Sequence, residues 1–294
     1  MIVQNLIKNA SMFLKKNNIK SSELDAEIIL ASIMKVSREY LLMNENLNVP
    51  RKLIKKFNFA IKRRSQKEPV AYIIKKKEFW SVDFLVNTST LIPRPETELL
   101  VSGIIKFIYD DEISILDIGT GSGCILLSLL KELKHAKGTG IDISNKALHI
   151  AYQNSKQLDL LQRSYFTKSS IERYKSEPFD LIVSNPPYII YDDLIKLSED
   201  IKNYEPLVAL NGGIDGLDLI KKVIYKSNRL IKKNGILAIE IGNNQYPKVS
   251  ELLEQNYYFE ISKICDFEGN VRCIISTKKS FFYENDFYFD NFIW

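Results

Sequence analysis

Residues 185–188 read Asn-Pro-Pro-Tyr, a combination of residue types that could position a ligand. They follow the segment 180–184, whose apolar residues predict a buried strand. Each proline restricts its own backbone and lacks an amide donor, so two in a row hold the chain rigid directly after that strand. A stiff turn without chemistry is one interpretation of this pattern. The other is a site that needs the Asn185 carboxamide held in one direction.

A glycine-rich segment lies at 117–123, between a predicted strand at 113–118 and a predicted helix at 122–133. Glycine permits a tight turn and close approach of a ligand to the backbone, and the start of a helix offers unpaired N–H groups. The spacing G-x-G-x-G is one residue shorter than the dinucleotide fingerprint. This shorter loop suits a cofactor that carries an amino-acid carboxylate, and S-adenosylmethionine has that shape. We expect the cofactor to contact the loop residues Gly119, Thr120, Gly121, Ser122 and Gly123.

Asp142 lies near the end of the next predicted strand, 138–143. A carboxylate in this place can accept hydrogen bonds from both ribose hydroxyls of an adenosine. The alternative is that Asp142 caps the following helix, a role for which Ser144 competes. Ligands of open parallel sheets bind beyond the carboxyl ends of the strands. The glycine loop, Asp142 and Asn185 all follow strand ends, so we expect them on one rim of the sheet.

Asn185 would then stand beside a methyl group carried on a positively charged sulfur. A planar amide or an aromatic amine is a weak nucleophile because its lone pair is delocalised. The side-chain oxygen of Asn185 and the carbonyl of Pro186 can accept hydrogen bonds from such an NH₂ group and orient it, while Tyr188 offers a flat face for stacking. This chemistry needs no metal and no histidine, which fits a chain with two histidines and three cysteines without C-x-x-C spacing.

The elements that must position these residues change in character along the chain. Residues 1–75 show helical periodicity and predict a small bundle, and 76–96 predict a linker with a β-hairpin. From 97 to 280 predicted strands and helices alternate, which indicates an α/β domain whose parallel sheet is covered on both faces. Its last two strands have no helix between them and predict an antiparallel pair. An aromatic-rich tail, 281–294, follows.

Composition and charge bound the class of protein. The chain has 294 residues, 45% hydrophobic and 26% charged, without an apolar run long enough for a bilayer or a signal-peptide pattern, so we expect a cytoplasmic protein without a membrane partner. Residues 1–90 hold 17 Lys and Arg against 8 Asp and Glu, a net charge of +9, whereas the remainder holds 24 against 28, a net charge of −4. Two interpretations of the basic residues in 1–90 are open. They face an anionic partner, either nucleic acid or an acidic protein surface, or they only keep the surface of the helices hydrated.

Over nearly its whole length the sequence resembles the HemK-type family of peptide chain release factor N5-glutamine methyltransferases. The shared motifs include the glycine loop, NPPY, and a D-x-x-G-x-x-R spacing that ends at Arg272. NPPY and the loop are common to many amino-methyltransferases, whereas RPETE at 94–98, EPLVAL at 205–210 and the helical N-terminal part are more particular to this family.

The resemblance implies a seven-stranded, Rossmann-like methyltransferase domain, a helical part that recognises the substrate, and S-adenosylmethionine as cofactor. The expected reaction is methylation of the side-chain amide nitrogen of glutamine in the GGQ motif of release factors. Asn185, Pro186, Pro187 and Tyr188 match the glutamine-binding motif, with Asn185 also near the cofactor, and the residues 94–96 match a segment beside the cofactor.

The chain departs from the family pattern in three places. Lys75 stands where relatives carry glycine, which we expect to alter a turn. At 168–171, where relatives often place an acidic or aromatic residue against adenine, Ser170 is the candidate contact. The tail 281–294 is also outside the usual pattern. Two other functions stay open: an adenine N6-methyltransferase acting on nucleic acid, which would need an exposed or flipped base, and a relative that binds a partner without catalysis.

Overall fold

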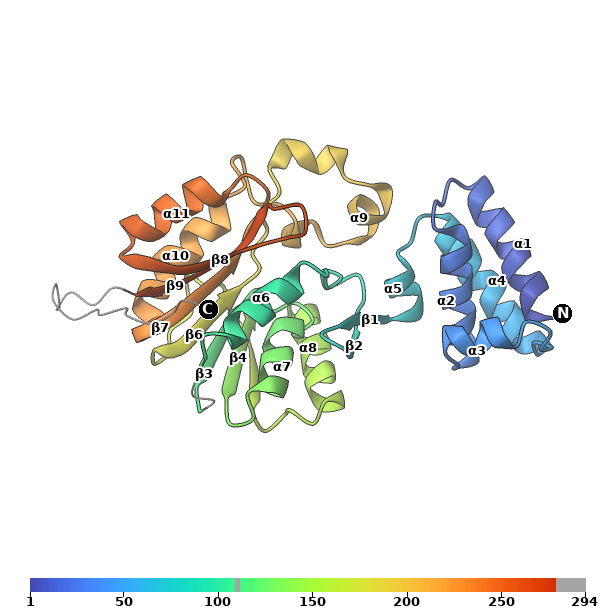
Figure 1. Ribbon diagram of the computed structural model, residues 1–294, viewed down its shortest axis with the longest axis horizontal. Coiled ribbons are helices and arrows are strands. Elements are labelled where there is room, and N and C mark those ends of the chain that lie inside the picture. The colour runs from blue at the N-terminus through green and yellow to red at the C-terminus, as the bar shows by residue number, and fades with distance from the viewer. Residues whose placement is uncertain (109–111, 279–294) are drawn as a thin grey trace.

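The computed structural model describes residues 1–108 and 112–278, and the tail 281–294 lies outside the described residues. A helical bundle at the N-terminal end is joined through a hairpin to an α/β part (Figure 1). The fold class expected from the sequence is confirmed. The boundaries that we assign to the domains remain a proposal.

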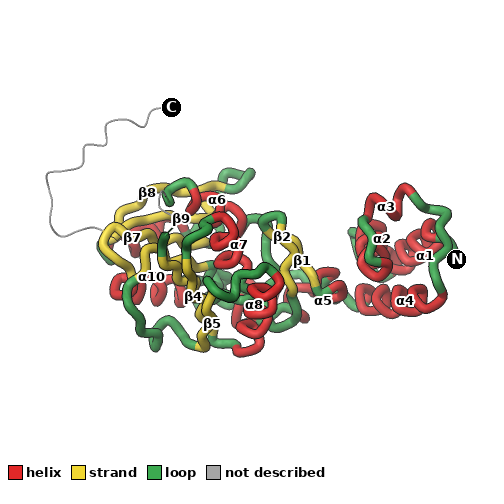
Figure 2. Tube along the Cα trace, turned by 90° about the horizontal axis from the view of Figure 1, so that it is seen from below, coloured by secondary structure: helices red, strands yellow, loops and turns green. Residues whose placement is uncertain are grey.

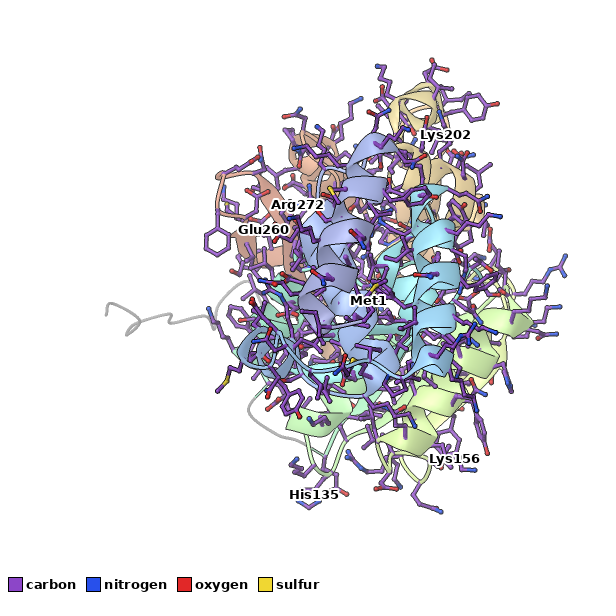
Figure 3. All side chains as sticks on the ribbon, turned by 90° about the vertical axis from the view of Figure 1, so that its right-hand side faces the viewer. Met1, His135, Lys156, Lys202, Glu260 and Arg272 are labelled. Carbon is purple, nitrogen blue, oxygen red and sulfur yellow. The ribbon has the colours of Figure 1, made fainter. Side chains whose placement is uncertain are left out.

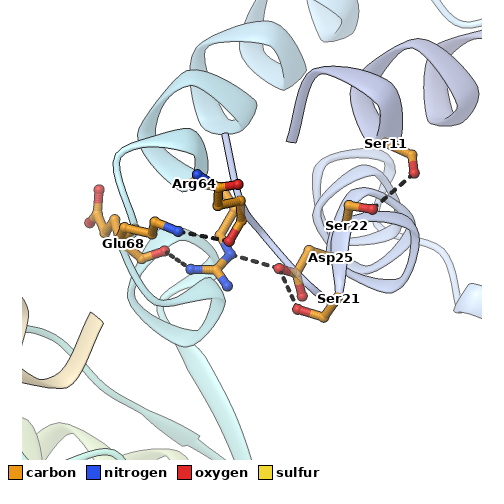
Figure 4. Close-up of polar contacts among 8 residues, drawn as sticks. Ser11, Ser21, Ser22, Asp25, Arg64 and Glu68 are labelled. Carbon is orange, nitrogen blue, oxygen red and sulfur yellow. Dashed lines mark hydrogen bonds and ion pairs between the residues drawn. The ribbon is translucent and has the colours of Figure 1, made fainter. Parts of the chain in front are cut away.

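The N-terminal bundle is built on apolar helix faces that meet in one core. Its helices are α1 (Val3–Lys16), α2 (Ser22–Met34), α3 (Arg38–Met43), α4 (Arg51–Ser65) and α5 (Val70–Ile74). Leu14, Ile29 and Phe57 are among the side chains that fill the core. Arg64 of α4 donates to the Asp25 carboxylate of α2 at 2.6 Å, and this buried ion pair ties the two helices together (Figure 4).

The linker consists of β1 (Lys76–Phe79) and β2 (Val82–Leu85), paired antiparallel between the bundle and the sheet (Figure 2). Its hydrogen bonds attach it to the α/β part. The Trp80 amide donates to Glu98 at 3.0 Å and the Leu85 amide to Asn154 at 2.7 Å. The helical bundle is therefore connected to the α/β part through a hairpin that is itself attached to the α/β part by hydrogen bonds.

The central sheet has the strand order β5-β4-β3-β6-β7-β9-β8. All pairs from β5 to β7 are parallel, and β9 pairs antiparallel with both β7 and β8. The sequence predicted the parallel sheet and the antiparallel pairing of the last two strands, but not the pairing of β9 with β7. The strands are β3 (Ser114–Ile118), β4 (Lys137–Asp142), β5 (Ser164–Lys168), β6 (Phe179–Ser184), β7 (Ile231–Glu240), β8 (Tyr258–Cys265) and β9 (Val271–Lys278). The chain starts at β3, builds outward through β4 and β5, and returns to β6. A crevice therefore opens beyond the carboxyl ends of β3 and β6.

Helices cover both faces of this sheet because its strands are apolar on both sides. One face packs on α6 (Thr97–Ile105) and α7 (Cys124–Glu132), with α8 (Asn145–Gln157) beside α7. The other face packs on α10 (Asp218–Leu230) and α11 (Tyr246–Gln255). Alternate residues of β3 show the division: Ile115 belongs to the first core and Leu116 to the second.

The sequence did not predict two features that border the crevice. One is α6, which follows the linker directly. The other is the segment between β6 and α10, which forms the short helices η1 (Tyr191–Lys196), α9 (Glu199–Tyr204) and η2 (Leu207–Ala209). Tyr204 donates to the Gln66 carbonyl at 2.8 Å, so this segment contacts the helical bundle. Figure 3 looks onto the bundle end, with Met1 near the middle and Lys202 of α9 at the rim.

Candidate active site

A cavity of about 660 Å³ lies at the carboxyl ends of the parallel strands. Its lining includes Gly119 and Gly121 after β3, Asp142 at the end of β4, Ser170 after β5 and Asn185 after β6. The structure thus brings together residues that the sequence placed on one rim. A volume between roughly 300 and 1,000 Å³ is usual for small-molecule sites.

The glycine loop takes a conformation that side chains disfavour. Gly119, Gly121 and Gly123 have φ values of 75°, 55° and 80°. A Cβ atom on Gly119 would meet no atom within 4 Å, and one on Gly121 would meet only a backbone oxygen at 3.9 Å. Since both residues line the cavity, the missing side chains leave room for a ligand against the backbone.

Other loop residues lie beneath the cavity rather than in its wall. Thr120 and Ser122 are buried, and the Thr120 hydroxyl donates to Asp117 at 2.6 Å. Burial raises the pKa of Asp117 to about 7, against the lowering effect of the Thr120 hydrogen bond. Gly123 begins α7 and packs closely on Leu127. These contacts give the loop its shape, and binding through the side chains of Thr120 and Ser122 remains a prediction.

Asp142 faces the cavity while its carboxylate also supports the loop. Its two oxygens accept hydrogen bonds from the Gly121 amide at 3.0 Å and the Ser144 amide at 2.8 Å. The helix cap of α8 is Ser144, which accepts from the Ala147 amide at 3.2 Å. Burial raises the pKa of Asp142. Because each carboxylate oxygen can accept more than one hydrogen bond, capacity remains for two hydroxyl donors.

A second, smaller cavity of about 130 Å³ adjoins the first. Arg94, Leu210 and the whole Asn185–Tyr188 turn line it. The two cavities share the lining residues Leu91, Asn185, Pro186, Pro187 and Ala209. Asn185 and the two prolines therefore stand at the boundary between a large compartment and a small one.

The Asn185 carboxamide is oriented by the start of α6. Its Nδ2 donates to the Thr97 hydroxyl oxygen at 3.1 Å. Among the described residues, no hydrogen bond reaches Asn185 Oδ1 or the Pro186 carbonyl oxygen. These two acceptors, adjacent in the chain, are available to a ligand that donates two hydrogen bonds.

Tyr188 is held from three sides behind this turn. Its hydroxyl donates to Glu240 at the end of β7 at 3.2 Å, and Arg272 of β9 donates to the hydroxyl at 3.3 Å with its guanidinium 5.8 Å from the ring centre. Gln245 donates to the Tyr188 carbonyl at 3.0 Å. Burial raises the pKa of Tyr188. Tyr188 also lines the smaller cavity, so a substrate bound there can stack only on the part of the ring that faces that cavity.

The RPETE and EPLVAL segments meet at one ion pair. Arg94 donates to the buried Glu205 at 2.5 Å, and the Ile92 amide donates to the other oxygen of Glu205 at 3.1 Å. Arg94 lines the smaller cavity, whereas Pro95 and Glu96 are exposed and line neither of the two cavities described here.

Sequence reasoning missed the residues that support Asn185 and Tyr188, namely Thr97, Glu240 and Gln245. For Thr97 a signal was present in RPETE, a motif that the sequence analysis noted for its resemblance only. The structure also explains the D-x-x-G-x-x-R spacing. Gly269 has a φ of 85° in the turn between β8 and β9, and that turn returns the chain so that Arg272 reaches Tyr188.

Within the described ranges, no helix is long and apolar enough to cross a membrane, and no group of three or more His, Cys, Asp and Glu side chains could hold a metal ion.

The strand order, the glycine loop over a cofactor-sized cavity and the adjoining acceptor cavity define an S-adenosylmethionine-dependent methyltransferase. Residues 109–282 match a family model described as a methyltransferase domain, and residues 5–74 match the PrmC N-terminal domain. A methyltransferase structure from Pyrococcus furiosus shares the fold, with a TM-score of 0.52 at 17% identity, covering 69% of this chain and 91% of the other.

Two curated relatives extend over the full length. The release factor glutamine methyltransferase of Clostridium acetobutylicum is 34% identical, with 95% of this chain and 99% of the relative covered. That of Buchnera aphidicola subsp. Schizaphis graminum is 38% identical, with 92% and 100% covered. The chain belongs to the release factor glutamine methyltransferase family.

Proposed function

We propose that this enzyme transfers a methyl group from S-adenosylmethionine to the side-chain amide nitrogen of the GGQ glutamine in peptide chain release factors. The observation that carries the proposal is the place of Asn185, at the boundary of the two cavities, with its side-chain oxygen and the Pro186 carbonyl free to accept. The family relatives, named for this activity, support the same reaction.

The chain's own groups overcome the weakness of the amide as a nucleophile. Asn185 Oδ1 and the Pro186 carbonyl oxygen each accept one hydrogen of the glutamine NH₂, and this fixes the plane and direction of the nitrogen before reaction. Because these acceptors are built into a rigid turn, little reorganisation is needed. When bound, S-adenosylmethionine would supply a methyl group on a sulfonium sulfur: the N–C bond would form as the S–C bond breaks, and one amide proton would pass to water.

The cofactor would be held by residues that line the larger cavity. Gly119 and Gly121 leave space against the backbone, and Asp142 has lone pairs left for the ribose hydroxyls. Ser170 lies in the same wall, next to Ile171, where the adenine end would be placed. Thr120, Ser122 and Gly123 act by shaping the loop.

The smaller cavity is large enough for an amide side chain. A cavity of about 150 Å³ admits a molecule of the size of benzene, so one of about 130 Å³ has room for a carboxamide. A nucleic-acid methyltransferase would in addition have to extract its base from a stack. In our proposal the helical bundle recognises the release factor. Because release factors work in translation, we also propose that the enzyme acts in the cytoplasm.

The test offers purified release factor and nucleic acid in separate reactions with labelled S-adenosylmethionine. We expect label in the protein alone and, by mass spectrometry, one added methyl group on the GGQ glutamine. A parallel reaction with the Asn185→Ala variant serves as the negative control. Label confined to nucleic acid, or a methyl group on another residue, would overturn the proposal.

A further inference from the structure

The segment that follows the hairpin, residues 87–91, forms part of the wall of the larger cavity, and we call it the strap. Residues 88–91 line that cavity, and Leu91 also lines the smaller one. The strap forms neither a helix nor a strand. Its position therefore depends on turn and side-chain contacts, and the shape of the larger cavity depends on that position.

The strap is a turn that Asn87 holds together from within. The Asn87 side-chain oxygen accepts from the Ser89 amide at 2.8 Å. The Asn87 carbonyl accepts from the Thr90 amide at 3.0 Å and from the Thr90 hydroxyl at 3.2 Å. These bonds give the turn its shape, but they do not attach it to the rest of the protein.

A hydrogen bond from the helical bundle supplies that attachment. The Tyr72 hydroxyl of α5 donates to the Thr90 carbonyl at 2.7 Å. Tyr72 is 3% exposed and Thr90 is 1% exposed, so the bond is shielded from water. Within the described part of the chain, no other hydrogen bond joins residues 87–91 to a residue outside the strap.

Helix α5 holds the Tyr72 side chain in place through two groups of apolar contacts. Ile73 and Ile74 pack against the core of the bundle. Tyr72 itself packs with Val86 and Ile92, the residues directly before and after the strap. Tyr72 thus connects a helix of the bundle with both ends of the strap by packing, and with the strap itself by a hydrogen bond.

We infer that Tyr72 is a positioning residue whose hydroxyl holds the strap in place against the cofactor in the larger cavity. A buried carbonyl without a donor is costly, so loss of the hydroxyl favours conformations in which the Thr90 carbonyl turns toward water. Because residues 88–91 all line the cavity, such a turn moves its wall. A ligand that fits only the closed wall then binds more weakly, in proportion to the fraction of molecules that remain closed.

The inference rests on the proposed function in one respect, the assignment of the larger cavity to S-adenosylmethionine. It does not depend on which substrate receives the methyl group. A hydroxyl that served the fold alone would lower the free energy of unfolding when removed, but it would leave the cofactor affinity of the folded protein unchanged. Affinity therefore separates the two roles.

The experiment compares Tyr72→Phe, which keeps the ring, with the full-length wild type. We expect the Kd for S-adenosylhomocysteine by calorimetry to rise by about three- to tenfold, the range of one lost hydrogen bond. The KM for S-adenosylmethionine should rise equally, with kcat at saturating cofactor and release factor within about twofold of wild type. Without ligand, the amides of residues 88–91 should exchange hydrogen faster in the variant.

The matched control is Tyr204→Phe. It also removes a tyrosine hydroxyl that joins the bundle to the rest of the molecule, the donor to the Gln66 carbonyl at 2.8 Å, but Gln66 lines neither cavity. The affinity of this variant for S-adenosylhomocysteine should equal that of wild type. A second variant, Asn87→Ala, loosens the strap from within and leaves the bundle untouched, so it should weaken binding in the same direction as Tyr72→Phe.

Urea denaturation establishes that each variant is folded before affinity is compared. Wild-type affinity in folded Tyr72→Phe or Asn87→Ala would overturn the inference and leave the proposed function intact. An equal loss of affinity in Tyr204→Phe would also overturn it, because the effect would then belong to any contact with the bundle. Failure of the wild type to bind S-adenosylhomocysteine would instead remove the proposed function.

Discussion

At the scale of single residues, the account depends on which atoms remain available at Asn185. Its nitrogen is engaged by Thr97, whereas its oxygen and the Pro186 carbonyl accept nothing from the described residues. Replacement of Asn185 by alanine should lower kcat by about a hundred- to a thousandfold, the usual cost of one preorganised hydrogen-bonding group in a transition state. Cofactor affinity by calorimetry should change much less, since the glycine loop and Asp142 are untouched.

The control for that variant is the conservative exchange Asn185→Asp. A carboxylate keeps an acceptor oxygen but loses the Nδ2 donor to Thr97, and activity should fall between wild type and Asn185→Ala. If Asn185→Ala turned over like wild type, the role of its side-chain oxygen would be refuted.

Glu240 makes the folding stability depend on pH. Burial raises the pKa of its carboxyl from 4.5 to about 7, with Glu96 also raising it and Arg272, Thr97 and Tyr188 lowering it. Between these two values the unfolded chain releases the proton while the folded protein keeps it, so the contribution of Glu240 to stability falls as the pH rises from about 4.5 to about 7. Urea denaturation across this range should show the wild type losing stability relative to Glu240→Gln. A difference that stays constant with pH would contradict the raised pKa.

The residue scale is also where prediction from sequence reached its limit. The types and spacing at 119–123, 142 and 185–188 predicted one shared rim of the sheet, and Gly119, Gly121, Asp142 and Asn185 do line one cavity there. The supporting residues could not be derived this way. Thr97 lies 88 positions before Asn185, and Glu240 lies 52 positions after Tyr188, so only the folded sheet brings them together.

At the scale of elements, the amphipathic helices and apolar strands were predictable, and α6 and the helices between β6 and α10 were not. Helix α6 has apolar residues on several sides because it is covered by the sheet and α7, so it lacks a clear polar face. The helices within residues 191–209 are short. They are held by contacts distant in sequence, such as Glu205 with Arg94 and Tyr204 with Gln66.

The end of α5 carries a local strain that the resemblance helps to explain. Lys75 ends this helix in the left-handed conformation, with a φ of 60°, at the position for which the family pattern in the sequence analysis implies glycine. A side chain there costs about 1–2 kcal/mol relative to glycine. Lys75→Gly should therefore raise the free energy of unfolding by about 1 kcal/mol, measured by urea denaturation with unchanged kcat. Lys77→Gly, in the adjoining strand, is the control and should destabilise; a loss of stability in Lys75→Gly would show that the turn is not strained.

At the scale of the whole molecule, the helical bundle presents positive charge on a part joined to the catalytic part by one hairpin. Arg51, Lys52, Lys55 and Lys56 are exposed on α4. If this surface binds an acidic face of the release factor, then replacing the three lysines by glutamate should raise KM for the intact factor by roughly tenfold at low salt and less at high salt.

A short GGQ peptide is the matched substrate for that variant. We expect such a peptide to occupy the smaller cavity without extending to α4, so its kinetics should not respond to the charge reversal. Equal KM values for wild type and variant on the intact factor would mean that the lysines only solvate the helix.

The most direct measurement is a crystal structure of the enzyme with S-adenosylhomocysteine and a GGQ peptide. The account predicts the glutamine side chain in the smaller cavity, with its nitrogen within about 3.2 Å of both Asn185 Oδ1 and the Pro186 carbonyl oxygen. A glutamine seated elsewhere, or an Asn185 amide that turns its NH₂ toward the substrate, would contradict it.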